Sequence, residues 1–113
     1  MLGQVADALG AKKVNIRAFL AAVMDGRGFV RVVVDKPAVA RKVFRDHGWV
    51  TTEDEVVEVT VADRPGVLGQ IADKLGAAGI NVQYAYLGTA KSASKVNLYL
   101  AVADAAAAVK ALR

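Results

Sequence analysis

The chain has 113 residues, which fits one ordinary domain or two very small ones. Hydrophobic residues make up 55% of it, enough for a core, yet no apolar run reaches the roughly 18 residues that a membrane-spanning helix needs. The absence of cysteine excludes disulfides and thiolate sites, and the net charge of +4 comes from basic residues scattered among acidic ones rather than from a basic tail.

The first half of the chain has the pattern of a helix, a β-hairpin and a second helix. Leu2 to Lys12 carries apolar residues at helical spacing, and Val14 to Met24 is rich in strand-forming residues. Asp25-Gly-Arg-Gly is typical of a hairpin turn, which predicts a second strand after it. Pro37 then suits the first turn of a helix that ends at Gly48. The inward-facing residues of the second strand are expected to be Val30, Val32 and Val34.

The second half begins with a strand and then follows the same order. Valines alternate with polar residues from Glu55 to Ala62, and from Val67 onward the apolar residues fall on one face of a helix. Gly79 stands where a helix end needs a left-handed residue. A strand is then predicted from Ile80 to Leu87.

The remaining segments complete this pattern. Lys95 to Val102 alternates apolar and polar residues, which predicts a strand with one buried face. Asp104 can cap a last helix that runs to Arg113. Between the halves, Trp49 to Thr52 is interpreted as a short strand.

The two halves share a repeated sequence. When Leu2 is set against Leu68, an offset of 66 residues, twelve positions pair, of which nine are identical and three exchange one aliphatic side chain for another. The identities include Asn15 with Asn81 and two pairs of glycines. Two unrelated helical segments would rarely agree at glycine and asparagine, so the sequence indicates an internal duplication.

A duplicated βαββαβ unit predicts an α+β fold. We expect two ferredoxin-like repeats, residues 1–52 and 53–113, each with an antiparallel sheet and both helices on one face. The first repeat lacks the strand that precedes the helix in the second, and the strand expected after the last helix is missing too. Bare sheet edges of this kind need cover, so either the sequence is shortened or a partner subunit supplies strands.

Asp63-Arg64-Pro65-Gly66 links a predicted strand to a predicted helix. Asp63 is a reasonable helix cap, Pro65 presets the helical backbone angle, and Gly66 lets another group approach the backbone. The first amides of a helix lack internal partners and carry the positive end of its dipole, which favours a carboxylate. Asn81, at the start of the next strand, offers a donor and an acceptor. These groups suit a small zwitterion such as an amino acid, although a plain strand-to-helix turn would explain the same residues.

Three segments carry a resemblance to a known family: DRPGVLGQIADKL, AGINV and KVNLYLAV. With them the second half resembles an ACT domain, the small regulatory module of amino-acid metabolism, and the first half resembles the same family without its first strand. The resemblance implies a stand-alone tandem ACT protein that binds an amino acid where two ACT domains meet. The residues it implicates are Asp63, Arg64, Pro65, Gly66, Val67, Leu68 and Asn81, with Asn15 as the counterpart of Asn81 in the first repeat.

The first repeat departs from this pattern. It lacks the Pro-Gly loop, and Lys12-Lys13 stands where the second repeat has Ala78-Gly79. Its helix therefore ends without glycine, at a cost of about 1 kcal/mol if the left-handed angle is kept. The loop of the second repeat is the expected ligand site.

No acid–base pair, nucleophile–base pair or metal cluster recurs in both copies, so we expect no catalysis, metal or cofactor. His47, the one histidine, is expected to have a structural role at a helix end, and Trp49 to pack at the link between the repeats. Tyr84, Tyr86 and Tyr99 could form a stacking platform for single-stranded nucleic acid, but the chain has no basic-aromatic run of that type.

The sheet face opposite the helices of the first repeat is expected to be apolar and therefore covered, which predicts a homodimer through sheet faces or edges. We assign to this face Phe19, Ala21, Val23, Phe29 and Val33, with Arg17 and Arg31 among them.

Three hypotheses for function follow. The favoured one is a non-catalytic, amino-acid-binding regulatory protein. The alternatives are a ligand-free module that dimerises or grips a partner enzyme, and a nucleic-acid-binding ferredoxin-like domain. The start of the chain has no basic region before a hydrophobic segment, so no secretory signal or membrane partner is expected and a cytoplasmic location is the default. Which amino acid is bound, and in which pathway, does not follow from the sequence.

Overall fold

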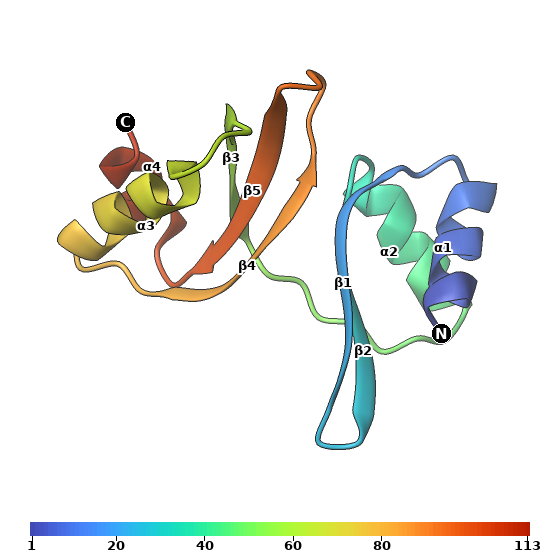
Figure 1. The fold of residues 1–113 in the computed structure, drawn as a ribbon. Coiled ribbons are helices and arrows are strands. Elements are labelled where there is room, and N and C mark those ends of the chain that lie inside the picture. The colour runs from blue at the N-terminus through green and yellow to red at the C-terminus, as the bar shows by residue number, and fades with distance from the viewer. The chain divides into compact units, whose positions relative to one another are not determined.

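The computed structural model describes residues 1–113 as two compact units, Met1–Glu53 (unit 1) and Asp54–Arg113 (unit 2). Figure 1 shows helices and strands in each unit. None of the four helices has the length and apolar character needed to cross a membrane.

Unit 1 consists of a β-hairpin and two helices. Its elements are α1 (Leu2–Ala11), β1 (Ile16–Met24), β2 (Arg27–Val34) and α2 (Pro37–Asp46). The turn is formed by Asp25 and Gly26, both with positive φ, and the strands pair antiparallel. Pro37 is the first residue of α2, as its restricted backbone favours. The core of unit 1 contains Val5, Leu9, Val14, Ala40 and Val43, with Ile16 and Val34 packed against it.

The segment Trp49–Thr52 is not a strand, contrary to the sequence prediction. The amide of Trp49 donates to the carbonyl of Phe44 at 3.0 Å, and Gly48 adopts a φ of 69°. These are the features of a glycine-terminated helix end, which draws the chain back over α2. The Trp49 ring lies 5.9 Å from the Phe44 ring and packs against the core of unit 1. Trp49 therefore belongs to the C-terminal cap of α2 and not to a strand.

Unit 2 consists of a three-stranded antiparallel sheet, in the order β3-β5-β4, and two helices. Its elements are β3 (Val56–Ala62), α3 (Val67–Ala77), β4 (Val82–Thr89), β5 (Lys95–Val102) and α4 (Ala105–Ala111). Ile71 and Leu75 of α3 and Ala108 of α4 share one core with sheet residues, so both helices cover the same face (Figure 1). The core residues from the sheet are Val57, Leu98, Leu100 and Val102. Asp104 caps α4 as predicted, because its Oδ1 accepts from the Ala107 amide at 3.0 Å.

The strand β4 begins at Val82, two residues later than predicted. Ile80 belongs to the end of α3 instead, since its amide donates to the Leu75 carbonyl at 2.9 Å. Gly79 has the left-handed φ of 73° that its place after the helix suggested.

The strand β5 is buried on both faces, whereas its alternating sequence predicted one buried face. Asn97 and Tyr99 lie on the side away from the helices, yet they are only 5% and 1% exposed. The side-chain amide of Asn97 is hydrogen-bonded there, because Nδ2 donates to the Thr89 carbonyl and Oδ1 accepts from the Thr60 hydroxyl. Because β5 is the central strand, neighbours on both sides cover its polar positions.

A β-bulge changes which residues of β1 face the helices. Ile16 opposes Val34, but after the extra residue Arg17 the pairing resumes with Ala18 opposite Val33 and Phe19 opposite Val32. Directly opposed residues share a face, and Val32 alternates onto the same face as the core residue Val34. The prediction that places Phe19, Ala21 and Val23 opposite the helices is therefore wrong, because simple alternation does not anticipate a bulge.

The second strand of the hairpin follows the predicted alternation. Phe29, Arg31 and Val33 lie on the face away from the helices, and the Arg31 guanidinium carbon is 5.6 Å from the centre of the Phe29 ring. The bulge thus shifts β1 alone. Phe19 and Val23 end up on the helix side but remain 54% and 74% exposed.

Candidate functional site

The predicted site residues Asp63 to Gly66 form the loop between β3 and α3. The Asp63 amide donates to the Ser94 carbonyl at 2.9 Å, and the Arg64 amide donates to the Ala62 carbonyl at 3.1 Å. Gly66 is the N-cap residue, with φ 86°. A Cβ on Gly66 would meet no atom within 4 Å, so the backbone angle rather than crowding requires glycine here. The space above this residue is open.

Asp63 does not cap α3, contrary to the sequence interpretation. Gly66 holds the N-cap position, and no side chain bonds to the first amides of the helix. The turn through Pro65 and Gly66 places Asp63 too early in the chain to serve as the cap. Its side chain is exposed.

The first turn of α3 presents backbone donors. The Val67 amide makes a long bond of 3.4 Å to the Arg64 carbonyl, whereas the amides of Leu68 and Gly69 make no hydrogen bond in the chain. The Leu68 side chain beside them is 58% exposed. Unpartnered amides at a helix start carry partial positive charge, which suits an anion.

The side chain of Arg64 adds a full positive charge near this helix start. Its Nη2 donates to Oε1 of Gln70, in the first turns of α3, at 3.2 Å. The bond turns the guanidinium toward the helix rather than away into solvent. A carboxylate bound to the free amides would therefore also gain from the Arg64 charge.

The structure does not bring Asn81 to this loop. Asn81 directly precedes Val82, which opposes Val102 at one end of β5, whereas the loop follows Ala62, which opposes Lys95 at the other end. At about 3.3 Å per residue, the eight residues of β5 separate the two ends by roughly 23 Å. One unit therefore cannot offer both groups to the same small molecule.

Asn15, the counterpart of Asn81 in unit 1, lies at the start of β1. Its amide donates to Asp35 Oδ1 at 2.9 Å and its carbonyl accepts from the Asp35 amide at 3.1 Å. These bonds fix the backbone of Asn15 against Asp35, and its side chain is exposed. The Pro65-Gly66 loop has no counterpart among the residues of unit 1 described here.

The three tyrosines of the sheet do stack, as the platform hypothesis requires. The rings of Tyr84 and Tyr86 are 6.2 Å apart and those of Tyr86 and Tyr99 are 5.8 Å apart. Tyr99, however, is only 1% exposed and Tyr84 and Tyr86 are half-buried. A stacked base needs an open ring face, so the burial of these rings disfavours nucleic-acid binding.

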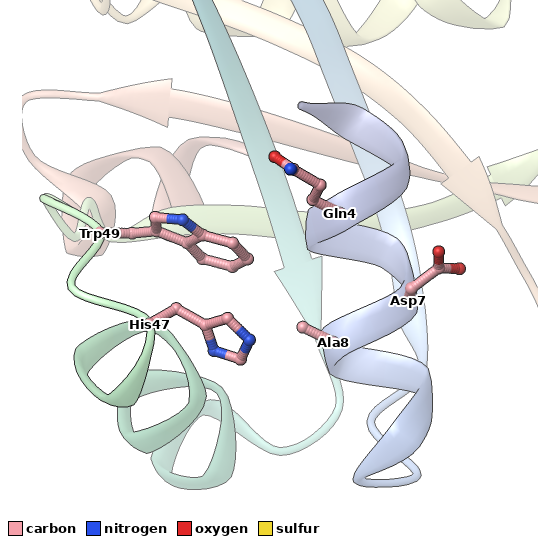
Figure 2. Close-up of a pocket in the computed structure, with 5 residues that line it drawn as sticks. All are labelled: Gln4, Asp7, Ala8, His47 and Trp49. Carbon is pink, nitrogen blue, oxygen red and sulfur yellow. The ribbon is translucent and has the colours of Figure 1, made fainter.

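An open hollow of about 540 Å³ lies in unit 1 (Figure 2). The rings of His47 and Trp49 stack with centroids 4.5 Å apart and point toward α1. Nδ1 of His47 contacts the Val43 carbonyl at 2.8 Å, which agrees with a structural role at the helix end. No sequence motif links His47 with Trp49, so the hollow was not predicted from the sequence. It is lined by Gln4, Asp7, Ala8, His47 and Trp49.

No group of three or more His, Asp or Glu residues is arranged to hold a metal ion. The polar groups around the start of α3 are the exposed Asp63 carboxylate, the Arg64 guanidinium and the free amides of Leu68 and Gly69.

The ACT domain model matches residues 56–112, from the start of β3 to the end of α4. Among solved structures, protein BT0572 from Bacteroides thetaiotaomicron is similar, with a TM-score of 0.88 and 22% sequence identity over 99% of this chain and 76% of that one. At this identity the similarity establishes the α+β fold with two antiparallel sheets and four helices. No curated protein sequence matches the chain significantly.

Proposed function

The chain belongs to the ACT domain family, and from this premise we propose that it is a non-catalytic regulatory protein of amino-acid metabolism that binds an amino acid at the loop between β3 and α3. The ACT domain is a typical small-molecule-binding regulatory domain. We also infer that the chain carries two ACT-type repeats, since both units contain a helix, a bulged hairpin and a second helix in the same order. A cytoplasmic location is part of this proposal.

The observation that carries the proposal is that the loop carries both positive and negative groups, one kind for each end of an amino acid. The amides of Leu68 and Gly69, with Arg64 close by, suit the carboxylate of an amino acid. The exposed carboxylate of Asp63 suits its ammonium group. The open space above Gly66 leaves room for the ligand to lie against the backbone.

The proposed assembly is a homodimer in which Asn81 of a second copy completes the site. ACT domains generally bind small molecules and oligomerise. Within one unit, Asn81 lies at the far end of the sheet from the loop, so a second copy could supply it. The exposed Leu68 beside the free amides would then gain a neighbour.

A thermal-shift screen of the twenty amino acids tests this proposal. An amino acid present at about a hundred times its Kd should raise the melting temperature by several degrees, because it binds only the folded chain. Asp63→Asn and Gly66→Val should abolish that rise. Asp73→Asn, which neutralises an exposed carboxylate within α3 itself, should keep it. A screen in which no amino acid shifts the wild-type chain would instead support the ligand-free interaction module.

A further inference from the structure

The hollow of unit 1 is bounded by two parts of its helix layer. Gln4 and Ala8 project into it from α1, while His47 and Trp49 follow the end of α2 (Figure 2). Its volume of about 540 Å³ lies within the range of small-molecule sites in proteins, roughly 300–1,000 Å³. The hollow is therefore large enough for a ligand of the size of a metabolite.

The wall made by the two rings is held by contacts at the end of α2. The Trp49 amide donates to the Phe44 carbonyl at 3.0 Å, and the left-handed angle of Gly48 turns the chain there. Nδ1 of His47 contacts the Val43 carbonyl at 2.8 Å. The two rings then stack on each other, with centroids 4.5 Å apart. These contacts are local to the helix end, so the cap of α2 itself places both rings.

The other wall is a side of the first helix that is open in both units. In unit 2 the strand β3 and its loop precede the helix α3. The residues of α3 that correspond to the three lining residues of α1 are nevertheless all exposed, namely Gln70, Asp73 and Lys74. A strand ahead of the helix therefore leaves this side of it uncovered, because a strand adds to the sheet and not to the helix layer.

The polar groups of the hollow are acceptors and a negative charge. A carbonyl only accepts, so the contact with Val43 assigns the proton of the neutral His47 ring to Nδ1 and leaves Nε2, on the edge toward α1, as an acceptor. The Gln4 side chain extends toward the rings and can present its amide oxygen, and the carboxylate of Asp7 is exposed at the rim. No lysine or arginine lines the hollow. These groups suit a cation that donates several hydrogen bonds.

We propose that the hollow of unit 1 binds a small molecule through a guanidinium group. A guanidinium is planar and has several N–H donors, so it can donate to His47 and Gln4 together. It is also weakly hydrated and tolerates contact with the ring carbons of Trp49 and the methyl group of Ala8, whereas an ammonium group is a compact, strongly hydrated charge. The carboxylate of Asp7 attracts the positive charge at the rim. This binding does not depend on the amino-acid site in unit 2.

Fluorescence of the full chain tests the proposal, because Trp49 is the one tryptophan in the sequence. The probe is agmatine, which carries a guanidinium group but lacks the carboxylate that the β3–α3 loop is proposed to bind. At constant ionic strength, agmatine should change the emission of Trp49 in a saturable way. Putrescine, with an ammonium group in place of the guanidinium, should bind at least about fivefold more weakly. The absence of a saturable change with agmatine would overturn the proposal, and equal affinity for putrescine would overturn the assignment of a guanidinium.

Two variants locate the binding, one of them with a matched control in unit 2. Asp7→Asn should weaken agmatine binding about two- to fivefold, as expected for one exposed charge, whereas Asp73→Asn at the corresponding position of α3 should leave it unchanged. Ala8→Leu should abolish binding by filling the hollow, and the helix position tolerates a long side chain in α3, where Lys74 occupies it. Circular dichroism verifies that each variant folds. Agmatine affinity equal to that of the wild type in Asp7→Asn and in folded Ala8→Leu would place the bound molecule elsewhere and overturn the proposal.

Discussion

Left-handed backbone angles occur at corresponding residues of the two units. Lys13, just after α1, has φ 59°, and Gly79, just after α3 and 66 residues later, has φ 73°. The sequence comparison already showed lysine in the first repeat where the second has glycine. The structure shows that both residues adopt the left-handed conformation. A side chain at such an angle is strained, whereas glycine is not, so unit 1 keeps the turn at a cost that unit 2 avoids. The Lys13 carbonyl accepts a bond from Lys36 Nζ at 3.0 Å, which helps to hold the turn.

Lys13→Gly should therefore stabilise the protein by about 1 kcal/mol, because it relieves the left-handed strain and leaves the carbonyl in place. The matched control is Lys12→Gly, since Lys12 has φ −100° and should gain nothing from glycine. Urea unfolding monitored by circular dichroism would measure both midpoints. A lower midpoint for Lys13→Gly than for the wild type would refute the strain argument.

If Arg64 recognises the carboxylate of the ligand, removing its charge should affect only ligands that carry a carboxylate. Arg64→Gln should weaken binding of the free amino acid by roughly 10- to 150-fold, because a charge-assisted bond contributes about 1.5–3 kcal/mol. It should have little effect on the corresponding carboxamide, which carries no negative charge. Isothermal titration calorimetry of both ligands checks this, and an equal loss for both would remove Arg64 from carboxylate recognition.

At the scale of elements, the sequence predicts most helices and strands but not which side chains of β1 and β4 face the helices. Both strands carry a bulge, at Arg17 and at Gln83, again 66 residues apart. A bulge reverses the faces of every residue after it, and no residue type in these strands signals it. The site loop was predictable, because Pro-Gly after a strand marks a helix entrance. The distance from that loop to Asn81 was not, since it depends on strand direction.

The bulge in β4 sets a testable contrast between two opposed leucines. Leu87 and Leu98 pair across β4 and β5 on the helix side, yet Leu98 is 4% exposed and Leu87 is 59% exposed. Leu98→Ala should cost about 2–5 kcal/mol by leaving a cavity in the core of unit 2, whereas Leu87→Ala should cost less than about 1 kcal/mol. Thermal or urea unfolding measures both. Similar losses would mean that the helices of unit 2 also cover Leu87.

At the scale of the whole molecule, the two units share an order of elements but differ in what they offer a ligand. Unit 2 has the Pro-Gly loop with free amides, and unit 1 has a hollow beside His47 and Trp49 instead. The family match also falls on unit 2. We therefore propose amino-acid binding at the β3–α3 loop alone, with Asn81 reaching it from a second copy.

Association should accordingly depend on ligand. Sedimentation velocity is expected to show a species of about twice the monomer mass, and the bound amino acid should shift the equilibrium toward it, because a site shared by two copies links binding to assembly. Asn81→Ala should weaken this shift, whereas Asn15→Ala, in the unit without the loop, should leave it unchanged. A monomer in the presence of saturating ligand would exclude the shared site.

The most direct test of the central claim is a map of amide chemical shifts in the ¹⁵N-labelled chain, recorded while the amino acid selected by the thermal screen is added. We predict that the largest changes fall on Gly66, Leu68 and Gly69, whose amides line the entrance of α3. Changes confined to the hollow of unit 1, or spread over the sheet with the loop unaffected, would contradict the account.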